Sequence, residues 1–358
     1  MKLTASSSIP GNIPDTMEAM TLVGHGDFDM LQHNSAVAVP TILDNQVLIK
    51  VSAAGVNNTD INTRTAWYSK SSANSKDASW SGQALTFPRI QGADVCGEIV
   101  AVGKNVDPQR IGQRVLIEPC ITHVNGKKLT SPWYFGSECD GGFAQYTSVD
   151  AVHAYAINSA LSDIELASFP CSYSTAENML TKANVSSQER VLITGASGGV
   201  GSAAVQLAKA RGAFVIAITS REKREQLLSI GADQVIDRSD NLLTVLASNS
   251  VDVVIDLVAG KQWPQLLELL RPGGRYAVAG AIGGPMVDLD VRTLYLKDLS
   301  LFGCTVLQAG VFQALIKHIE QNNIKPLIAE VYALKDIPAA QRSFSQKQHV
   351  GKIVIDIK

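Results

Sequence analysis

The chain has 358 residues, of which 46 % are hydrophobic, and its 31 basic and 33 acidic residues leave a formal net charge of −2. This length predicts two domains rather than one, and the balanced charge argues against nucleic acid as the main partner. No apolar run approaches the roughly 20 residues that a membrane-spanning helix needs. The segment up to about Asp15 is polar and lacks the apolar core of a signal peptide, so we expect a cytosolic protein.

The first 155 or so residues have a β-rich, irregular pattern. Residues 47–51 (VLIKV) and 98–102 (EIVAV) are short runs rich in apolar and β-branched residues, which predict strands. Residues 70–83 are polar and rich in serine, which predicts an exposed loop.

From about Leu161 onward, short apolar runs alternate with helical periodicity. A helix is predicted over residues 262–270, followed by a turn at residues 272–274, and another helix around residues 312–321. Strands are predicted at residues 190–194, 213–219, 234–236, 251–258, 275–280 and 299–304, and the tail returns to a strand pattern at 351–355. Such alternation predicts an α/β domain whose parallel sheet is covered by helices.

These patterns predict two domains. Residues 1–155 together with 320–358 would form a β-rich domain, and residues 156–319 an inserted α/β domain. We expect the active site in the cleft between them.

A glycine-rich loop follows the strand at residues 190–194 and precedes a helical pattern. It reads Gly195-Ala196-Ser197-Gly198-Gly199-Val200-Gly201. A diphosphate needs backbone N–H groups brought close without a side chain in the way, and it gains from the positive end of a helix dipole. Gly198 would let the backbone approach the pyrophosphate, and Gly201 would let the helix pack on the strand. The alternative is a glycine-rich turn without a ligand, but the strand before the loop and the helix after it favour a dinucleotide.

The end of the next strand indicates which dinucleotide is bound. An NAD site places a carboxylate there to bind the ribose 2′-hydroxyl, but this chain has Ser220, followed by Arg221 and Lys223. A hydroxyl and nearby cations suit a 2′-phosphate, so we predict NADPH. Arg238 would reach the same adenosine end. Alternatively, these residues are the solvated first turn of the next helix.

Together with their surroundings, these residues resemble the medium-chain dehydrogenase/reductase superfamily, and within it the zinc-free quinone oxidoreductases. The blocks that carry the resemblance are residues 54–60 (AGVNNTD), 92–103 (GADVCGEIVAVG), 195–201 and 351–354 (GKIV). The resemblance implies a GroES-like β-domain plus a Rossmann domain with a doubly wound parallel sheet. It also implies a homodimer.

The same resemblance bears on whether this chain binds a catalytic zinc ion. Zinc alcohol dehydrogenases of this superfamily carry a cysteine where this chain has Asn57, and a His-Glu pair where it has Ala93-Asp94. Only Cys171 remains at the position of a third ligand. One thiolate and one carboxylate do not make the usual catalytic zinc site, so no bound metal is expected.

Without a metal, reduction of an electron-poor acceptor remains feasible, because hydride adds to carbon while negative charge moves onto oxygen. We therefore predict an NADPH-dependent oxidoreductase acting on a quinone or an α,β-unsaturated carbonyl compound, with Asn57 orienting the acceptor or the nicotinamide ribose and Thr59 helping to deliver a proton. Two alternatives are a zinc alcohol dehydrogenase with an unusual ligand set and an NADPH-binding sensor or structural protein without turnover. Asn57 and Thr59 could also simply cap a turn that Asp60 anchors.

Further cofactor contacts are expected beyond the glycine loop. Gly280, Ala281 and Ile282 follow the fifth strand of the predicted sheet and should face the nicotinamide. Lys352 resembles the lysine that many members of the superfamily place near the cofactor.

Overall fold

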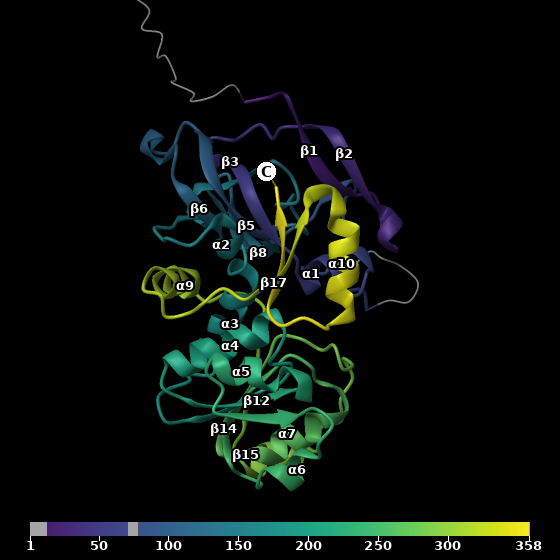
Figure 1. Cartoon of the computed structure of the whole chain (residues 1–358), viewed down its shortest axis with the longest axis vertical. Coiled ribbons are helices and arrows are strands. Elements are labelled where there is room, and N and C mark those ends of the chain that lie inside the picture. The colour runs from purple at the N-terminus through teal and green to yellow at the C-terminus, as the bar shows by residue number, and fades with distance from the viewer. Residues whose placement is uncertain (1–12, 71–77, 358) are drawn as a thin grey trace, which may run out of the picture. The chain divides into compact units, whose positions relative to one another are not determined.

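The computed structural model describes residues 13–70 and 78–357, and it divides into two compact units (Figure 1). The first unit comprises Met1–Pro170, Glu330–Gln346 and Ile353–Lys358, and the second comprises Cys171–Ala329 and Lys347–Lys352. The predicted α/β fold is confirmed. The change of unit at Pro170 lies beyond the expected boundary at residue 155, because α2 (Asp163–Leu166) packs on strands of the first unit.

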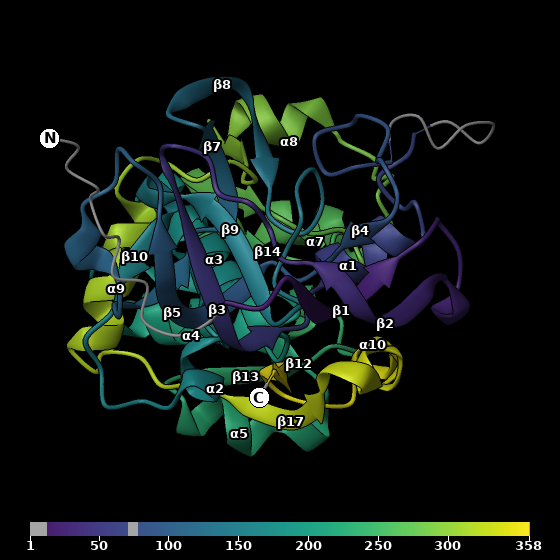
Figure 2. The same ribbon diagram turned by 90° about the horizontal axis from the view of Figure 1, so that it is seen from above.

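The first unit is built around β3 (Gln46–Gly55), which pairs antiparallel with β5 (Asp94–Val102), β9 (Tyr146–Asp150) and β18 (Lys352–Asp356). Figure 2 shows β3 and β5 lying side by side. The order in this sheet is β10-β6-β5-β3-β18-β17, with β9 attached to β3. The other strands of the unit are β1 (Thr16–Leu22), β2 (Leu31–Ala38), β4 (Arg89–Ile90), β6 (Arg114–Ile117), β7 (Cys120–Val124), β8 (Lys127–Tyr134), β10 (Ala154–Ala156) and β17 (Ile328–Ala333).

Two helices of the first unit flank its candidate functional residues. α1 (Asn58–Arg64) directly follows β3, and α10 (Ile337–Gln346) is amphipathic, with its apolar side chains in the core of the unit. The two helices are joined by a buried hydrogen bond of 2.9 Å from Arg64 Nε to Gln341 Oε1. This bond fixes α1 at the carboxyl end of β3, where the sequence block at residues 54–60 begins.

The second unit is a doubly wound parallel sheet of six strands in the order β13-β12-β11-β14-β15-β16. In Figure 1, helices lie on both faces of this sheet. Its strands are β11 (Arg190–Ile193), β12 (Phe214–Thr219), β13 (Gln234–Asp237), β14 (Val251–Asp256), β15 (Leu270–Val278) and β16 (Ser300–Gly303). Its α-helices are α3 (Pro170–Lys182, of which Pro170 belongs to the first unit), α4 (Gly199–Ala210), α5 (Arg224–Ser229), α6 (Leu242–Val245), α7 (Trp263–Leu269), α8 (Val291–Leu296) and α9 (Val311–Glu320).

The strand order places a topological switch between β11 and β14, where the chain direction across the sheet reverses. Ligands of open α/β sheets bind outside the carboxyl ends of the strands at such a point. The central strands β11, β12 and β14 are buried at nearly every residue, as parallel strands under helices require, whereas the edge strand β16 is largely exposed.

Two local predictions need correction. The turn expected at residues 272–274 is a bulge inside β15, because the strand already pairs at Leu270 and resumes at Arg275, with Gly273 at a φ of +72°. The serine-rich stretch is not uniformly exposed, since Ala78 and Ser79 are buried; residues 71–77 lie outside the described part. Among the described residues, no helix is long and apolar enough to cross a membrane.

Candidate functional site

The glycine loop joins β11 to α4 at the switch point of the second unit. Gly195 has a φ of +57°, a conformation that favours glycine, and Gly198 is the N-cap residue of α4. A Cβ atom at Gly201 would lie 2.2 Å from the carbonyl oxygen of Gly195, so no side chain fits there. At Gly198, by contrast, a Cβ would meet nothing closer than 3.5 Å, and the residue is exposed. The loop therefore combines tight helix–strand packing with an open backbone surface at a helix N-terminus, as a phosphate cradle requires.

A buried carboxylate holds the carboxyl ends of β11 and β14 together. Asp256 accepts hydrogen bonds from Thr194 Oγ1 (2.5 Å), from the N–H groups of Val258 (2.9 Å) and Ala259 (3.1 Å), and from Tyr276 Oη (2.5 Å). The Tyr276 hydroxyl also accepts a bond of 2.9 Å from Trp263 Nε1. Burial and the charge of Asp256 raise the pKa of Tyr276, which therefore stays a donor. This network fixes Thr194, the residue immediately before the glycine loop.

Tyr276→Phe is expected to lower the free energy of unfolding by about 1–3 kcal/mol, because Asp256 and Trp263 lose a buried partner. Chemical denaturation measures the change. Tyr295→Phe is the matched control, because Tyr295 is 59 % exposed and should cost little. Equal stability of the two variants would contradict the importance of this network.

The residues predicted to bind the 2′-phosphate follow β12, but they differ in their exposure and in the hydrogen bonds that they form. Lys223 Nζ donates to the carbonyl oxygens of Lys347 (2.8 Å) and His349 (2.9 Å). The Arg221 side chain is 86 % exposed, with its Nε 3.9 Å from Asp237 Oδ2. A backbone hydrogen bond, followed by one from the Ser220 hydroxyl, lowers the pKa of the exposed Glu222 carboxyl. A phosphate at this position would have to replace the Ser220–Glu222 bond.

The remaining predicted cofactor residues have varied surroundings. Arg238 is exposed. Partial burial lowers the pKa of Lys223, and the positive charge of Arg238 lowers it further. Lys352 is 2 % exposed, and its Cδ would lie 3.0 Å from a Cβ at Gly199, beside the N-terminus of α4. After β15, Gly280 and Ala281 are partly buried, and Ile282 is 63 % exposed. Ser197 and Val200 are partly exposed on the glycine loop.

In the first unit, Asn57 is buried and its amide is directed at Asp94. Asn57 Nδ2 donates to Asp94 Oδ2 (2.8 Å) and to the carbonyl oxygen of Gly55 (3.2 Å). Asp60 anchors the segment by accepting the N–H groups of Asn57 (2.8 Å) and Gly92 (3.2 Å). Both amide hydrogens of Asn57 are therefore engaged, and donation to an acceptor oxygen would require one of these bonds to open. Asp60 thus anchors the turn that carries Asn57, the residue predicted to orient the acceptor or the nicotinamide ribose.

Thr59 has a hydroxyl suited to proton delivery. Its Oγ1 is buried and has no hydrogen-bond partner among the described residues. Buried hydroxyl groups normally have a hydrogen-bond partner. A bound ligand could therefore supply the partner that Thr59 Oγ1 lacks.

Sequence reasoning missed three features of the second unit. Asp256 was not singled out, because one acid at the end of an apolar strand carries no distinctive spacing. Thr219 has a buried Oγ1 without a partner among the described residues, directly before Ser220. Lys347 contacts Lys223 across a separation of 124 residues, which no local pattern predicts.

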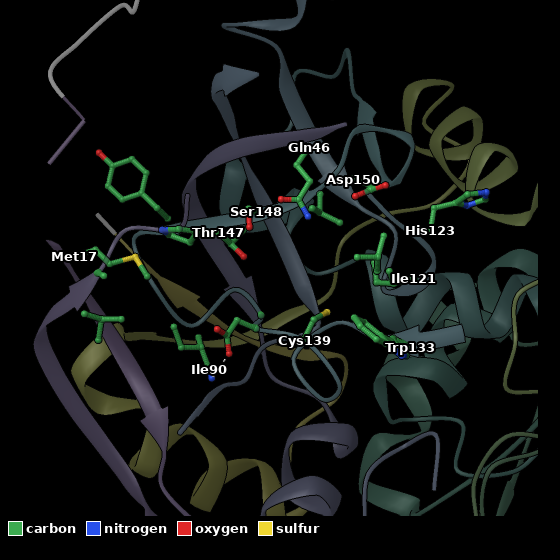
Figure 3. A pocket seen from close by; sticks show the side chains of 18 residues that line it. Met17, Gln46, Ile90, Ile121, His123, Trp133, Cys139, Thr147, Ser148 and Asp150 are labelled. Atoms are coloured by element: carbon green, nitrogen blue, oxygen red, sulfur yellow. Dashed lines mark hydrogen bonds between the residues drawn. The ribbon is translucent and has the colours of Figure 1, made fainter. Parts of the chain in front are cut away.

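A cavity of about 270 Å³ lies in the first unit and is distinct from all of these residues. Figure 3 shows that its labelled lining residues include Met17, Gln46, His123, Trp133 and Cys139. It contains neither Asn57 nor Thr59 nor any predicted cofactor residue. Two of its polar side chains, Gln46 and Asp150, already accept backbone hydrogen bonds.

Comparisons with known proteins match both units. Residues 199–321 match the family model of zinc-binding dehydrogenases, and residues 43–159 match the alcohol dehydrogenase GroES-like domain. A 2-methylene-furan-3-one reductase of Solanum lycopersicum is 34 % identical over 327 residues, which cover 90 % of this chain and 74 % of that protein. The chain belongs to the medium-chain dehydrogenase/reductase superfamily.

Two further similarities fit this assignment. The quinone oxidoreductase of Rattus norvegicus is 29 % identical over 356 residues, covering 95 % of this chain and 97 % of that protein. A solved structure from Sinorhizobium meliloti, provisionally named an alcohol dehydrogenase, is 43 % identical with a TM-score of 0.89, and the match covers 96 % and 97 % of the two chains. The chain is thus an oxidoreductase of this superfamily.

The zinc in the name of the matched family does not fit the residues present. Asn57 and Asp94 are hydrogen-bonded to each other, and an amide nitrogen that donates hydrogen bonds is not a zinc ligand. Ala93, between Gly92 and Asp94, has no donor atom in its side chain. Among residues 13–70 and 78–357, no group of three His, Cys, Asp or Glu side chains could hold a metal ion.

Proposed function

We propose that this protein is a zinc-independent, NADPH-dependent reductase of quinones or α,β-unsaturated carbonyl compounds. The observation that carries the proposal is the buried bond between Asn57 and Asp94, in the segments where zinc relatives keep metal ligands. Without a Lewis acid to stabilise an alkoxide, alcohol oxidation is disfavoured. Conjugated acceptors suit such a site, because their negative charge is delocalised as it forms.

The glycine loop would hold the pyrophosphate of NADPH through the N-terminus of α4, with Gly198 and Gly199 giving access to the backbone. Gly195 and Gly201 shape the loop, and Ser197 and Val200 flank it. Lys223, Arg221 and Ser220 would surround the 2′-phosphate, with Arg238 nearby. Gly280, Ala281, Ile282 and Lys352 would contact the nicotinamide half. Bound NADPH supplies the hydride.

Two residues of the first unit complete the proposed chemistry. Thr59, whose hydroxyl has no hydrogen-bond partner among the described residues, would donate a hydrogen bond to the acceptor oxygen. After hydride transfer the hydroxyl would give its own proton to that oxygen and would regain a proton from water. Asn57, held by Asp94 and Gly55, would orient the acceptor or the nicotinamide ribose.

The test is NADPH consumption by the purified protein with a panel of quinones and enones, with the metal content measured on the same sample. Turnover without bound zinc supports the proposal. Turnover of alcohols that requires about one zinc per chain would favour an alcohol dehydrogenase with an unusual ligand set. Tight NADPH binding with no turnover of any acceptor would favour a sensor or structural protein.

We also infer that the protein forms a homodimer through the second unit. Among the described residues, β16 is an edge strand of the six-stranded sheet, and such an edge is available for pairing with another chain. The exposed large hydrophobic residues nearby in the sequence are Ile282, Met286, Val287, Leu289, Val291, Tyr295, Leu296, Leu301 and Val306. Light scattering should give twice the chain mass of 38.2 kDa, and Leu301→Glu should shift it to the monomer. A monomeric wild-type protein would contradict the inference.

A further inference from the structure

The segment at residues 347–352 lies against the glycine loop of the second unit. The N–H of Gly351 donates to the carbonyl oxygen of Ser197 at 3.1 Å. Lys223 Nζ donates hydrogen bonds to the carbonyl oxygens of Lys347 and His349 in the same segment. The same Nζ lies 3.5 Å from Ser197 Oγ of the glycine loop. A residue first expected to bind phosphate thus also holds this segment in place.

Lys347 adopts a backbone conformation that does not favour lysine. Its φ is +55°, in the left-handed region where glycine is the usual residue. The bond to Lys223 uses only the main-chain carbonyl of Lys347, which any residue would supply. Glycine would supply the same carbonyl oxygen and would suit this φ better.

Three lysines gather beside the loop. Lys347 is exposed as a residue, yet desolvation of its ammonium and the positive charges of Lys352 and Lys223 lower its pKa to about 8. Lys352 is buried beside Gly199, and Lys223 lies within reach of Ser197. Positive charges that lie close together destabilise one another, and an anion bound beside them stabilises their charged forms.

We propose that Lys347 is a phosphate-binding residue that confers selectivity for the 2′-phosphate of NADPH, while Lys223 both contributes charge and holds the segment at 347–352 in position. The inference rests on the proposed NADPH dependence. The 2′-phosphate is favoured over the pyrophosphate because Lys223 follows β12, the strand whose end meets the adenosine ribose in this fold.

The proposal makes NADPH affinity dependent on pH. The charged groups that face Lys347 are Lys352 of β18 and Lys223 of the turn after β12, and Lys223 is itself influenced by Arg238 and Glu222. The 2′-phosphate is mainly dianionic above about pH 6. Lys347 is charged below its pKa and neutral above it, so NADPH affinity should fall as the pH rises from 7 to 9. NADH, which lacks this phosphate, should show a smaller change.

The experiment compares dissociation constants for NADPH and NADH in Lys347→Gly, Lys347→Arg and the control Lys317→Gln, an exposed lysine on α9. Lys347→Gly should weaken NADPH binding about tenfold or more with little effect on NADH. Its melting temperature should not fall, because glycine suits a φ of +55°. Lys347→Arg should retain NADPH affinity and lose the decline between pH 7 and 9, because guanidinium stays charged.

The binding data also distinguish a failure of the Lys347 assignment from a failure of the proposed function. Equal weakening of NADPH and NADH by Lys347→Gly would overturn the assignment to the 2′-phosphate, and so would no change in either. A wild-type protein that binds neither dinucleotide would overturn the proposed function itself. A wild-type protein that prefers NADH would overturn the NADPH dependence on which this inference rests.

Discussion

Gly201→Ala is expected to abolish measurable NADPH binding and to lower the free energy of unfolding by about 1–3 kcal/mol, the usual cost of forcing atoms into a packed site. The added methyl group would lie 2.2 Å from Gly195 O and 2.6 Å from Ala196 Cα, so α4 and the loop must move apart. These are backbone atoms and cannot rotate away. Calorimetric titration with NADPH and chemical denaturation measure the two effects.

Gly198→Ala is the matched variant. Its φ of −73° suits alanine and its Cβ meets no atom closer than 3.5 Å, so its stability should equal that of the wild type. NADPH binding should still weaken, because the methyl group occupies the open face of the loop. Full affinity in Gly198→Ala would contradict the placement of the pyrophosphate at this residue. Wild-type stability in Gly201→Ala would contradict the packing argument.

Asn57→Asp is expected to lower the free energy of unfolding by about 3 kcal/mol at pH 8, because it places a second buried carboxylate against Asp94. Two carboxylates at this distance raise the pKa of one of them. An acid whose folded pKa lies above its unfolded value destabilises the protein above the unfolded pKa, near 4, and causes no loss below it. The loss should therefore be smaller at pH 5 than at pH 8.

Denaturation at both pH values measures the effect, and Asn58→Asp provides the control. Asn58 is the exposed first residue of α1, where an added acid is neutral or mildly favourable. Equal stability of the two variants at pH 8 would show that Asn57 does not face Asp94. It would also remove the main observation for zinc-independent chemistry.

Much of the second unit could be predicted from the sequence, because buried parallel strands and amphipathic helices leave distinct periodicities. The strand at residues 190–194, the loop at 195–201 and the following helix are adjacent in the sequence, so their local pattern sufficed. The bulge at Gly273 was predicted as a turn, because a proline followed by two glycines is typical of both. Only the pairing of Leu270 with Val251 shows that the strand had already begun.

The polar contacts of the site were harder to predict, because they depend on residues far apart in the sequence. Asn57 and Asp94 were noticed separately as departures from a zinc pattern, but their hydrogen bond joins residues 37 apart and was not predicted. The hydrogen bond from Lys223 to the carbonyl oxygen of Lys347 joins two segments of the second unit that are 124 residues apart. Residues 330–346, which lie between them in the sequence, belong to the first unit. Nothing in the sequence around residue 347 indicates that this lysine lies close to Lys223 and Lys352.

The zinc content of catalytically active protein tests the central proposal most directly. Metal analysis should find well below one zinc per chain in a preparation that consumes NADPH with an enone or a quinone, and a chelator should leave that rate unchanged. About one zinc per chain, with activity lost on its removal and restored on its return, would contradict zinc-independent reduction.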